Sequence, residues 1–233
     1  MVTAAWPELT FALWQQIGIV ALWLGAIVLA AEGLDRFVKA EPEIVRKVVH
    51  IGVGNVILLA WWLHIPLWLG VIASLLASAI ALLSYRFTIL RSVNSVGRKS
   101  YGTFFYAISF GVLIAWFWSI DRPQYAALGL LVMTWGDGLA AIVGQRFGKH
   151  RYKLWDEQKS WEGSIAMALV SYTMSGLIFF GLQGNSPATW LIPIPIAIIA
   201  TLLEACSKYG VDNLTVPIGS AAIAFVLDRL WLG

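Results

Sequence analysis

The sequence predicts an all-α membrane protein, a bundle of seven or eight transmembrane helices. Of its 233 residues, 59% are hydrophobic and only 12% are charged, whereas about a quarter of the residues in a soluble domain are charged. Apolar runs of about 20 residues, the length that crosses a hydrocarbon core of about 30 Å, recur along the whole chain. No long linker or low-complexity tract separates them, so residues 1–233 are expected to form one integral membrane domain.

Seven apolar runs are clear, and they define the expected helices in chain order: 12–31, 48–64, 67–84, 102–120, 124–143, 163–182 and 189–205. An eighth, 216–232, is apolar except for Asp228 and Arg229, which lie near its end and can extend to the interface. Pro193 and Pro195 fall inside the seventh run, where neighbouring helices or water must satisfy the freed carbonyl groups.

The loops between these runs differ sharply in charge. Fourteen of the sixteen Lys and Arg residues lie in one alternate set of loops: 32–47, 85–101, 144–162 and 206–215. Because cytoplasmic loops carry the Lys and Arg excess, this set is expected to face the cytoplasm and the amino terminus to lie outside. The thirteen tryptophans suit membrane interfaces, nucleic acid is not an expected partner, and the lone Cys206 excludes an intrachain disulfide.

The segment from Trp135 to Ser164, WGDGLAAIVGQRFGKHRYKLWDEQKSWEGS, holds the strongest candidate residues. Asp137 lies near the cytoplasmic end of the fifth run, where an ionised carboxylate is costly unless it faces a cavity, a cation or a partner. Gly136, Ala140 and Gly144 form a small-xxx-small stripe that allows close helix packing. Packing explains the glycines, but it gives no reason for Asp137.

Basic residues and glycines follow in a pattern that suits a polyphosphate, because cationic side chains bond phosphate oxygens and glycine permits close backbone approach. Arg151 and Lys153 are explained by the positive-inside bias alone. Lys159 and Glu162 lie at the start of the sixth run, just before Gly163, and Arg146 follows the fifth run. Paired carboxylates such as Asp137 and Glu162 suit Mg²⁺, which takes one or two carboxylates together with substrate phosphates.

Two further clusters are expected at the same membrane face. Arg46, Lys47 and His50 end the first basic loop, and on a helix Arg46 and His50 share a face. A histidine there is as readily structural as catalytic. Asp212 and Asn213 bring oxygen ligands before Pro217, although a turn explains them equally well.

Taken together, these segments resemble the CTP-dependent polyprenol kinases, a family of membrane enzymes that includes phytol, farnesol and dolichol kinases, with phytol kinases the nearest in pattern. The matching segments are RKVVHIGVG from Arg46, KSYGTFFYA from Lys99, GDGLAAIVGQRFGK from Gly136, KSWEGS from Lys159 and VDNLTVPIG from Val211. The resemblance implies phosphorylation of an isoprenoid alcohol in the bilayer, most simply phytol, with CTP or another nucleoside triphosphate as donor and Mg²⁺ as cofactor. It also implies that Gly136, Asp137 and Lys159 belong to the nucleotide site.

The resulting hypothesis divides the site by role. Mg²⁺ is expected on Asp137 with Glu162 or Asp212, and Asp137 or His50 is expected to accept the hydroxyl proton. The residues expected around the nucleotide are Arg46 or Lys47, Arg146, Lys159, Gly136, Gly144, Gly163, Asn213 and Glu162. Two alternatives stay open, a lipid-phosphate cytidylyltransferase with the same nucleotide and metal, and a small-molecule transporter. The oligomeric state is not predicted.

Overall fold

The computed structural model describes residues 11–87, 101–155 and 157–232, and it confirms the all-α bundle. In this part of the chain, eight helical segments are long and apolar enough to cross a membrane. They are Leu13–Val38, Pro42–Trp62, Leu67–Tyr85, Gly102–Ser119, Pro123–Phe147, Trp161–Gln183, Pro187–Ala205 and Asp212–Trp231. The chain is therefore a multi-pass membrane protein, and the last apolar run is a span like the other seven.

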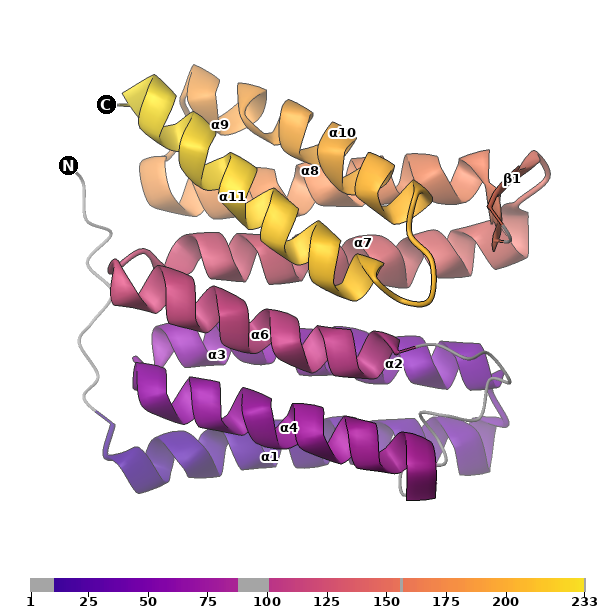
Figure 1. Cartoon of the computed structure of the whole chain (residues 1–233), viewed down its shortest axis with the longest axis horizontal. Coiled ribbons are helices and arrows are strands. Elements are labelled where there is room, and N and C mark those ends of the chain that lie inside the picture. The colour runs from indigo at the N-terminus through magenta and orange to yellow at the C-terminus, as the bar shows by residue number, and fades with distance from the viewer. Residues whose placement is uncertain (1–10, 88–100, 156, 233) are drawn as a thin grey trace.

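The helices that build these spans lie side by side in one bundle (Figure 1). Their bounds are α1 Leu13–Gly33, extended by the π-helical turn η1 Leu34–Val38, α2 Pro42–Gly54, α3 Val56–Trp62, α4 Leu67–Phe87, α6 Gly102–Ser119, α7 Pro123–Phe147, α8 Trp161–Gln183, α9 Pro187–Leu191, α10 Pro193–Ala205 and α11 Asp212–Leu232.

Two helices begin earlier than the hydropathy pattern indicates. α2 begins at Pro42 rather than near residue 48, since proline favours the first turn of a helix. Its first turns carry Glu43, Arg46 and Lys47, and these charges hide the helix from a search for apolar runs. α11 begins at Asp212 and contains Pro217. The early starts place Lys47 and Asp212 on helices rather than in loops.

α7 is the central helix. Every residue from Tyr125 to Thr134 is buried, and α7 packs against α8, α11, α2, α6 and α3. A helix that is apolar on all sides belongs inside a bundle, and Figure 1 shows α7 between α2–α3 on one side and α8 and α11 on the other. Asp137, which lies ten residues before the end of α7, is therefore largely enclosed by neighbouring helices.

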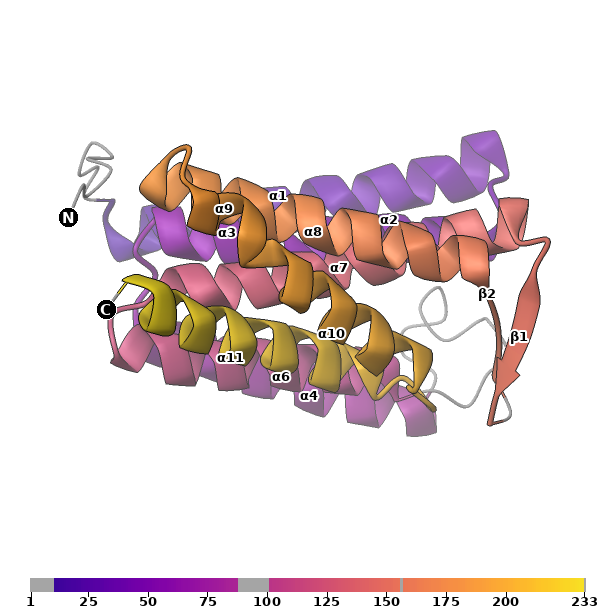
Figure 2. The ribbon, with the colours of Figure 1, turned by 90° about the horizontal axis from the view of Figure 1, so that it is seen from above.

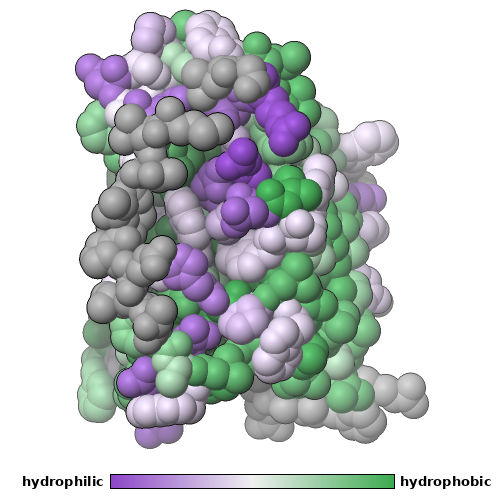
Figure 3. Space-filling model, turned by 90° about the vertical axis from the view of Figure 1, so that its left-hand side faces the viewer, coloured by the Kyte–Doolittle hydropathy of each residue, from purple (hydrophilic) through white to green (hydrophobic). Residues whose placement is uncertain are grey.

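The connections sort to the two ends of the bundle (Figures 1 and 2). The link from α1 to α2, the segment between α7 and α8, and the turn from α10 to α11 lie at one end, called here the basic end, while both termini lie at the other. Seen from the end with the termini, hydrophilic side chains gather on the end face and hydrophobic ones cover the flank beside it (Figure 3). This distribution is the one expected where a bundle leaves a bilayer.

Between α7 and α8 the chain forms an antiparallel hairpin of strands β1 (Arg151–Leu154) and β2 (Glu157–Ser160), which the sequence did not predict. Tyr152 pairs with Lys159 across the strands, and the hydroxyl group of Tyr152 lies 2.6 Å from that of Ser164 on α8. The hairpin is thus fastened to α8, and Lys159 is held on an ordered strand at the basic end.

Candidate active site

The predicted residues of α2 and α7 meet at the basic end. Lys47 Nζ donates a hydrogen bond to Asp137 Oδ2 at 2.6 Å, and the two side chains are only 3% and 15% exposed. His50 Nε2 lies 3.6 Å from the same oxygen, which is too long for a hydrogen bond. His50 Nε2 is buried and has no hydrogen-bond partner among the described residues. The carboxylate therefore faces a cation, and the imidazole presents an unused nitrogen beside it.

His50 is positioned by two residues that the sequence analysis did not single out. The imidazole stacks on the ring of Tyr106 from α6, with centroids 4.5 Å apart. The Tyr106 hydroxyl donates to the backbone carbonyl of His50 at 3.0 Å and lies 2.7 Å from the hydroxyl of Thr134 on α7. Gly54 allows this approach, because a Cβ there would fall 2.2 Å from Thr134 Oγ1. A buried hydroxyl pair thus fixes the relative positions of α2, α6 and α7.

A second buried ion pair joins the hairpin to α10. Lys159 Nζ lies 2.6 Å from Glu204 Oε1 and also donates to the backbone carbonyl of Glu204. The side chains are 17% and 12% exposed. Glu204 is a carboxylate near the end of an apolar run, and that position is the signal by which sequence could mark it. Its pairing with Lys159, 45 residues earlier, required the fold.

Asp212 lies within electrostatic range of both ion pairs. It interacts electrostatically with Asp137, Lys159 and Lys47, and its backbone amide donates to Ser207 Oγ at 2.7 Å. Asn213 donates to Asp212 Oδ1 at 3.2 Å and so helps to orient this carboxylate. The residues that converge here form one charged cluster: Arg46, Lys47, His50, Asp137, Lys159, Glu204 and Asp212.

Two predicted arginines contribute differently. Arg46 binds Glu43 through two contacts of 2.5 and 2.8 Å, and it also interacts electrostatically with Asp137 and Asp212. Arg146 is exposed in the last turn of α7. Arg46 therefore belongs to the charged cluster, whereas Arg146 is exposed on the last turn of α7.

The contacts of Glu162 are with His150 rather than with Asp137. Gly163, the next residue, packs against Ala140 and Gly144, which follow Asp137 by three and seven residues on α7. Glu162 lies 2.7 Å from His150 Nδ1 and accepts a bond from the His150 backbone amide. It closes the turn that leads into the hairpin.

The predicted glycines lie where α7 and α8 touch. A Cβ on Gly163 would stand 3.0 Å from the Ala140 carbonyl oxygen, and one on Gly136 would stand 2.5 Å from Met167 Sδ. Gly144 faces Ser160 and Gly163 in the same seam. Helix packing accounts for all three, and their assignment to the nucleotide site stays a prediction. Lys99, in one of the segments that carry the resemblance, lies outside the described residues.

The cluster has the donors that a nucleotide-bound magnesium ion requires. Among the described residues, no three His, Cys, Asp or Glu side chains form a protein cage for a metal. Mg²⁺ in phosphoryl-transfer sites instead takes one or two carboxylates and completes its shell with phosphates and water. Asp137 and Asp212 are two carboxylates of the charged cluster, so they match that number.

Comparison with known proteins agrees with this chemistry. The chain is 50% identical to a phytol kinase of Synechocystis sp. over 95% of both chains. It is 26% identical to phytol kinase 1 of Arabidopsis thaliana, covering 93% of this chain and 78% of the relative, and 28% identical to a probable phytol kinase 1 of Oryza sativa, covering 87% and 70%. No family model matches the chain, and no solved structure is significantly similar to it.

Proposed function

The chain belongs to the phytol kinase family, and we propose that it transfers the terminal phosphoryl group of CTP to the hydroxyl group of phytol at the charged cluster. As a member of this family it is a kinase with an alcohol acceptor. The observation that carries the proposed location is the convergence of two buried lysine–carboxylate pairs, Lys47–Asp137 and Lys159–Glu204, at one end of a membrane-crossing bundle.

The place of the cluster suits the two substrates. A nucleoside triphosphate is highly charged and stays in water, whereas an isoprenoid alcohol is largely hydrocarbon and stays in the bilayer. Their reacting groups therefore meet only at the membrane boundary. Because the basic end carries most of the lysines and arginines, this boundary is the cytoplasmic one in our proposal.

Lys47 and Lys159 are the proposed phosphate ligands. Phosphoryl transfer asks the protein mainly to position the reactants and to stabilise charge on the phosphate oxygens. Asp137 accepts a hydrogen bond from Lys47, and Glu204 accepts one from Lys159. Each carboxylate thus holds its lysine side chain in position before the nucleotide binds. Arg46 adds positive charge at the edge of the cluster.

Asp137 and Asp212 are the proposed holders of Mg²⁺, which when bound would neutralise charge on the donor phosphates. Of the two candidates for proton acceptor, His50 is the better placed. Asp137 Oδ2 already accepts a bond from Lys47, while His50 Nε2, 3.6 Å away, has no hydrogen-bond partner among the described residues. In the proposal His50 accepts the proton of the phytol hydroxyl as the phosphoryl group is transferred.

Product analysis tests this function. The purified protein in lipid nanodiscs is incubated with phytol, Mg²⁺ and one of CTP, ATP, GTP or UTP, each labelled in the terminal phosphate. Phytyl phosphate together with CDP is the expected result, with CTP the preferred donor. Formation of a CDP-lipid and pyrophosphate from CTP and phosphatidic acid, without phytyl phosphate, would instead identify a cytidylyltransferase.

A further inference from the structure

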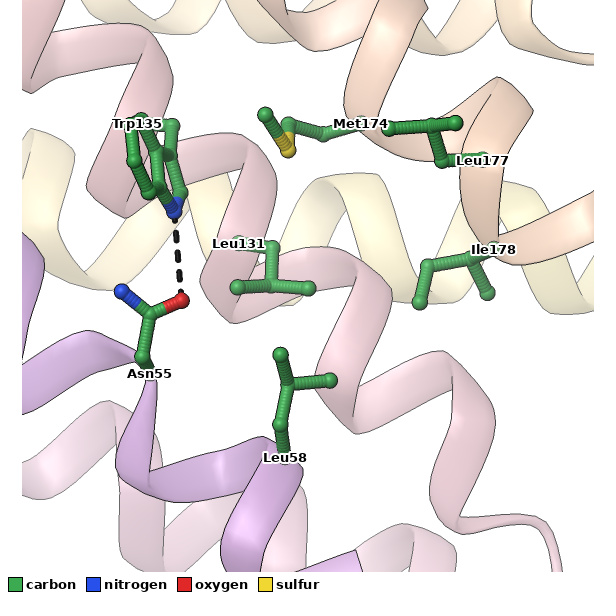
Figure 4. A pocket seen from close by; sticks show the side chains of 7 residues that line it. All are labelled: Asn55, Leu58, Leu131, Trp135, Met174, Leu177 and Ile178. Atoms are coloured by element: carbon green, nitrogen blue, oxygen red, sulfur yellow. Dashed lines mark hydrogen bonds between the residues drawn. The ribbon is translucent and has the colours of Figure 1, made fainter. Parts of the chain in front are cut away.

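The second span is interrupted at Asn55, between α2 and α3, and side chains of neighbouring helices fasten the chain there. Trp23 of α1 donates to the backbone carbonyl of Gly52 at 2.8 Å. Trp135 of α7 donates to the side-chain oxygen of Asn55 at 3.3 Å, as Figure 4 shows. Inside a membrane, such bonds satisfy polar groups that have no access to water. The stretch of chain that follows His50 is therefore held by α1 and α7.

Tyr106 of α6 makes a third contact with this stretch, and it holds His50 at two points. Its hydroxyl group donates to the backbone carbonyl of His50 at 3.0 Å, and its ring stacks on the imidazole with the two planes inclined by 26°. Because a phenol has a single proton, the Tyr106 oxygen accepts its 2.7 Å bond from the hydroxyl group of Thr134. Tyr106 is buried, so these contacts are shielded from both water and lipid. The backbone and the ring of His50 are thus fixed together.

We propose that Tyr106 is a positioning residue for the phosphoryl transfer and acts through His50. The inference rests on the proposed kinase function. In that reaction the proton of the alcohol passes to His50 Nε2, the alcohol oxygen bonds to the terminal phosphorus, and the bond from this phosphorus to its bridging oxygen breaks to release the nucleoside diphosphate.

The imidazole needs such a constraint. His50 Nε2 lies 3.6 Å from Asp137 Oδ2 and has no hydrogen-bond partner in the described part of the chain. No bond to Nε2 therefore fixes the plane of the ring, and the stacked ring of Tyr106 takes that role. Orientation matters for the rate, since a misplacement of about 1 Å in an active site can cost about 100-fold.

A second buried tyrosine gives a matched control. Tyr125 is 4% exposed and Tyr106 is 7% exposed, and the Tyr125 hydroxyl joins α7 to α11 at the opposite end of the bundle by donating to Asp228. Tyr106→Phe and Tyr125→Phe should therefore shift the unfolding equilibrium by similar factors, about two- to tenfold. Only Tyr106→Phe should lower kcat, by about tenfold, with the KM values for CTP and phytol within about twofold of the wild type. Tyr106→Leu, which also loses the stacked ring, should lower kcat by about 100-fold.

An equal loss of kcat in the two phenylalanine variants, or a loss that appears only in KM, would overturn the positioning role. A double-variant cycle then tests whether Tyr106 acts through His50. In a His50→Gln background, Tyr106→Phe should change kcat by less than about twofold, because the group that it positions is gone. A tenfold loss in that background would contradict the proposal. Wild-type kcat in His50→Gln alone would also overturn it, while leaving the kinase assignment intact.

The stacking can be observed without turnover. The chain contains three histidines, so protein labelled with carbon-13 at the imidazole Cε1 gives three NMR signals, and the His50→Gln variant identifies the one from His50. Its proton should lie upfield in the wild type and in Tyr106→Phe, because the stacked ring shields it, and should move downfield in Tyr106→Leu. An unchanged signal in Tyr106→Leu would overturn the proposal. If the wild-type protein forms no phytyl phosphate, the kinase proposal fails, whereas the spectrum still reports whether Tyr106 holds His50.

Discussion

The Lys47–Asp137 pair offers the sharpest perturbation, because both charges lie inside the bundle. Lys47→Met keeps the unbranched side chain and removes the cation, which leaves Asp137 without its 2.6 Å partner. Removing one member of a buried ion pair typically costs about 3–5 kcal/mol. The side chain of Asp137 retains 15% exposure and lies near His50, so we expect the lower end, about 3 kcal/mol. This loss shifts the unfolding equilibrium by roughly 100-fold.

The matched variants separate charge from packing. Asp137→Asn alone leaves the Lys47 ammonium group buried and unpaired, so it should destabilise the protein by a similar amount. The double variant Lys47→Met/Asp137→Asn carries no unpaired charge, and its free energy of unfolding should lie within about 1 kcal/mol of the wild type.

The assay is reversible unfolding in mixed micelles of SDS and a mild detergent. The thirteen tryptophans provide the fluorescence signal. A double variant whose destabilisation equals the sum of the two single variants would refute the reasoning, since the two charges would then not interact.

Three further predictions concern other parts of the site. Lys159→Ala should lower kcat/KM for phytol by about 100-fold or more, because it removes a donor that stabilises charge on the phosphates. Lys153 is exposed, and Lys153→Ala should change kcat/KM by less than about twofold. Both variants are measured with labelled CTP. Gly54→Ala would bring a Cβ within 2.2 Å of Thr134 Oγ1 and should cost about 1–3 kcal/mol in the same unfolding assay; wild-type stability would show that α2 and α7 are not so close. The exposed Cys206 in the turn before α11 should react with an impermeant maleimide only from the cytoplasmic side, and reaction from the outside would reverse the orientation.

The fold was largely predictable because hydrophobic length is the main signal in a membrane protein. Eight spans agree with the apolar runs, including the one that ends with Asp228 and Arg229. The start of α2 was missed because its charged first turns resemble a loop in hydropathy. The hairpin was missed because four-residue strands of mixed polarity carry little periodic signal.

The site was predictable in its residue types and less so in its pairings. A carboxylate in an apolar helix marked Asp137, and Glu204 lies in a similar position near the end of α10. No local pattern showed that Lys47 pairs with Asp137, 90 residues later, or that Tyr106 holds His50. The shared metal site of Glu162 and Asp137 stays a prediction, and the structure shows Glu162 paired with His150, a contact that no pattern in the sequence indicated.

The central claim is that the charged cluster performs the phosphoryl transfer, and the double variant Lys47→Met/Asp137→Asn tests it most directly. Once its unfolding curve has shown an intact fold, its rate of phytyl phosphate formation is measured at saturating CTP, Mg²⁺ and phytol. The account predicts a loss of at least about 1,000-fold, because a cationic phosphate ligand and a metal-binding carboxylate are removed together. A rate within about tenfold of the wild type would place the chemistry elsewhere in the molecule.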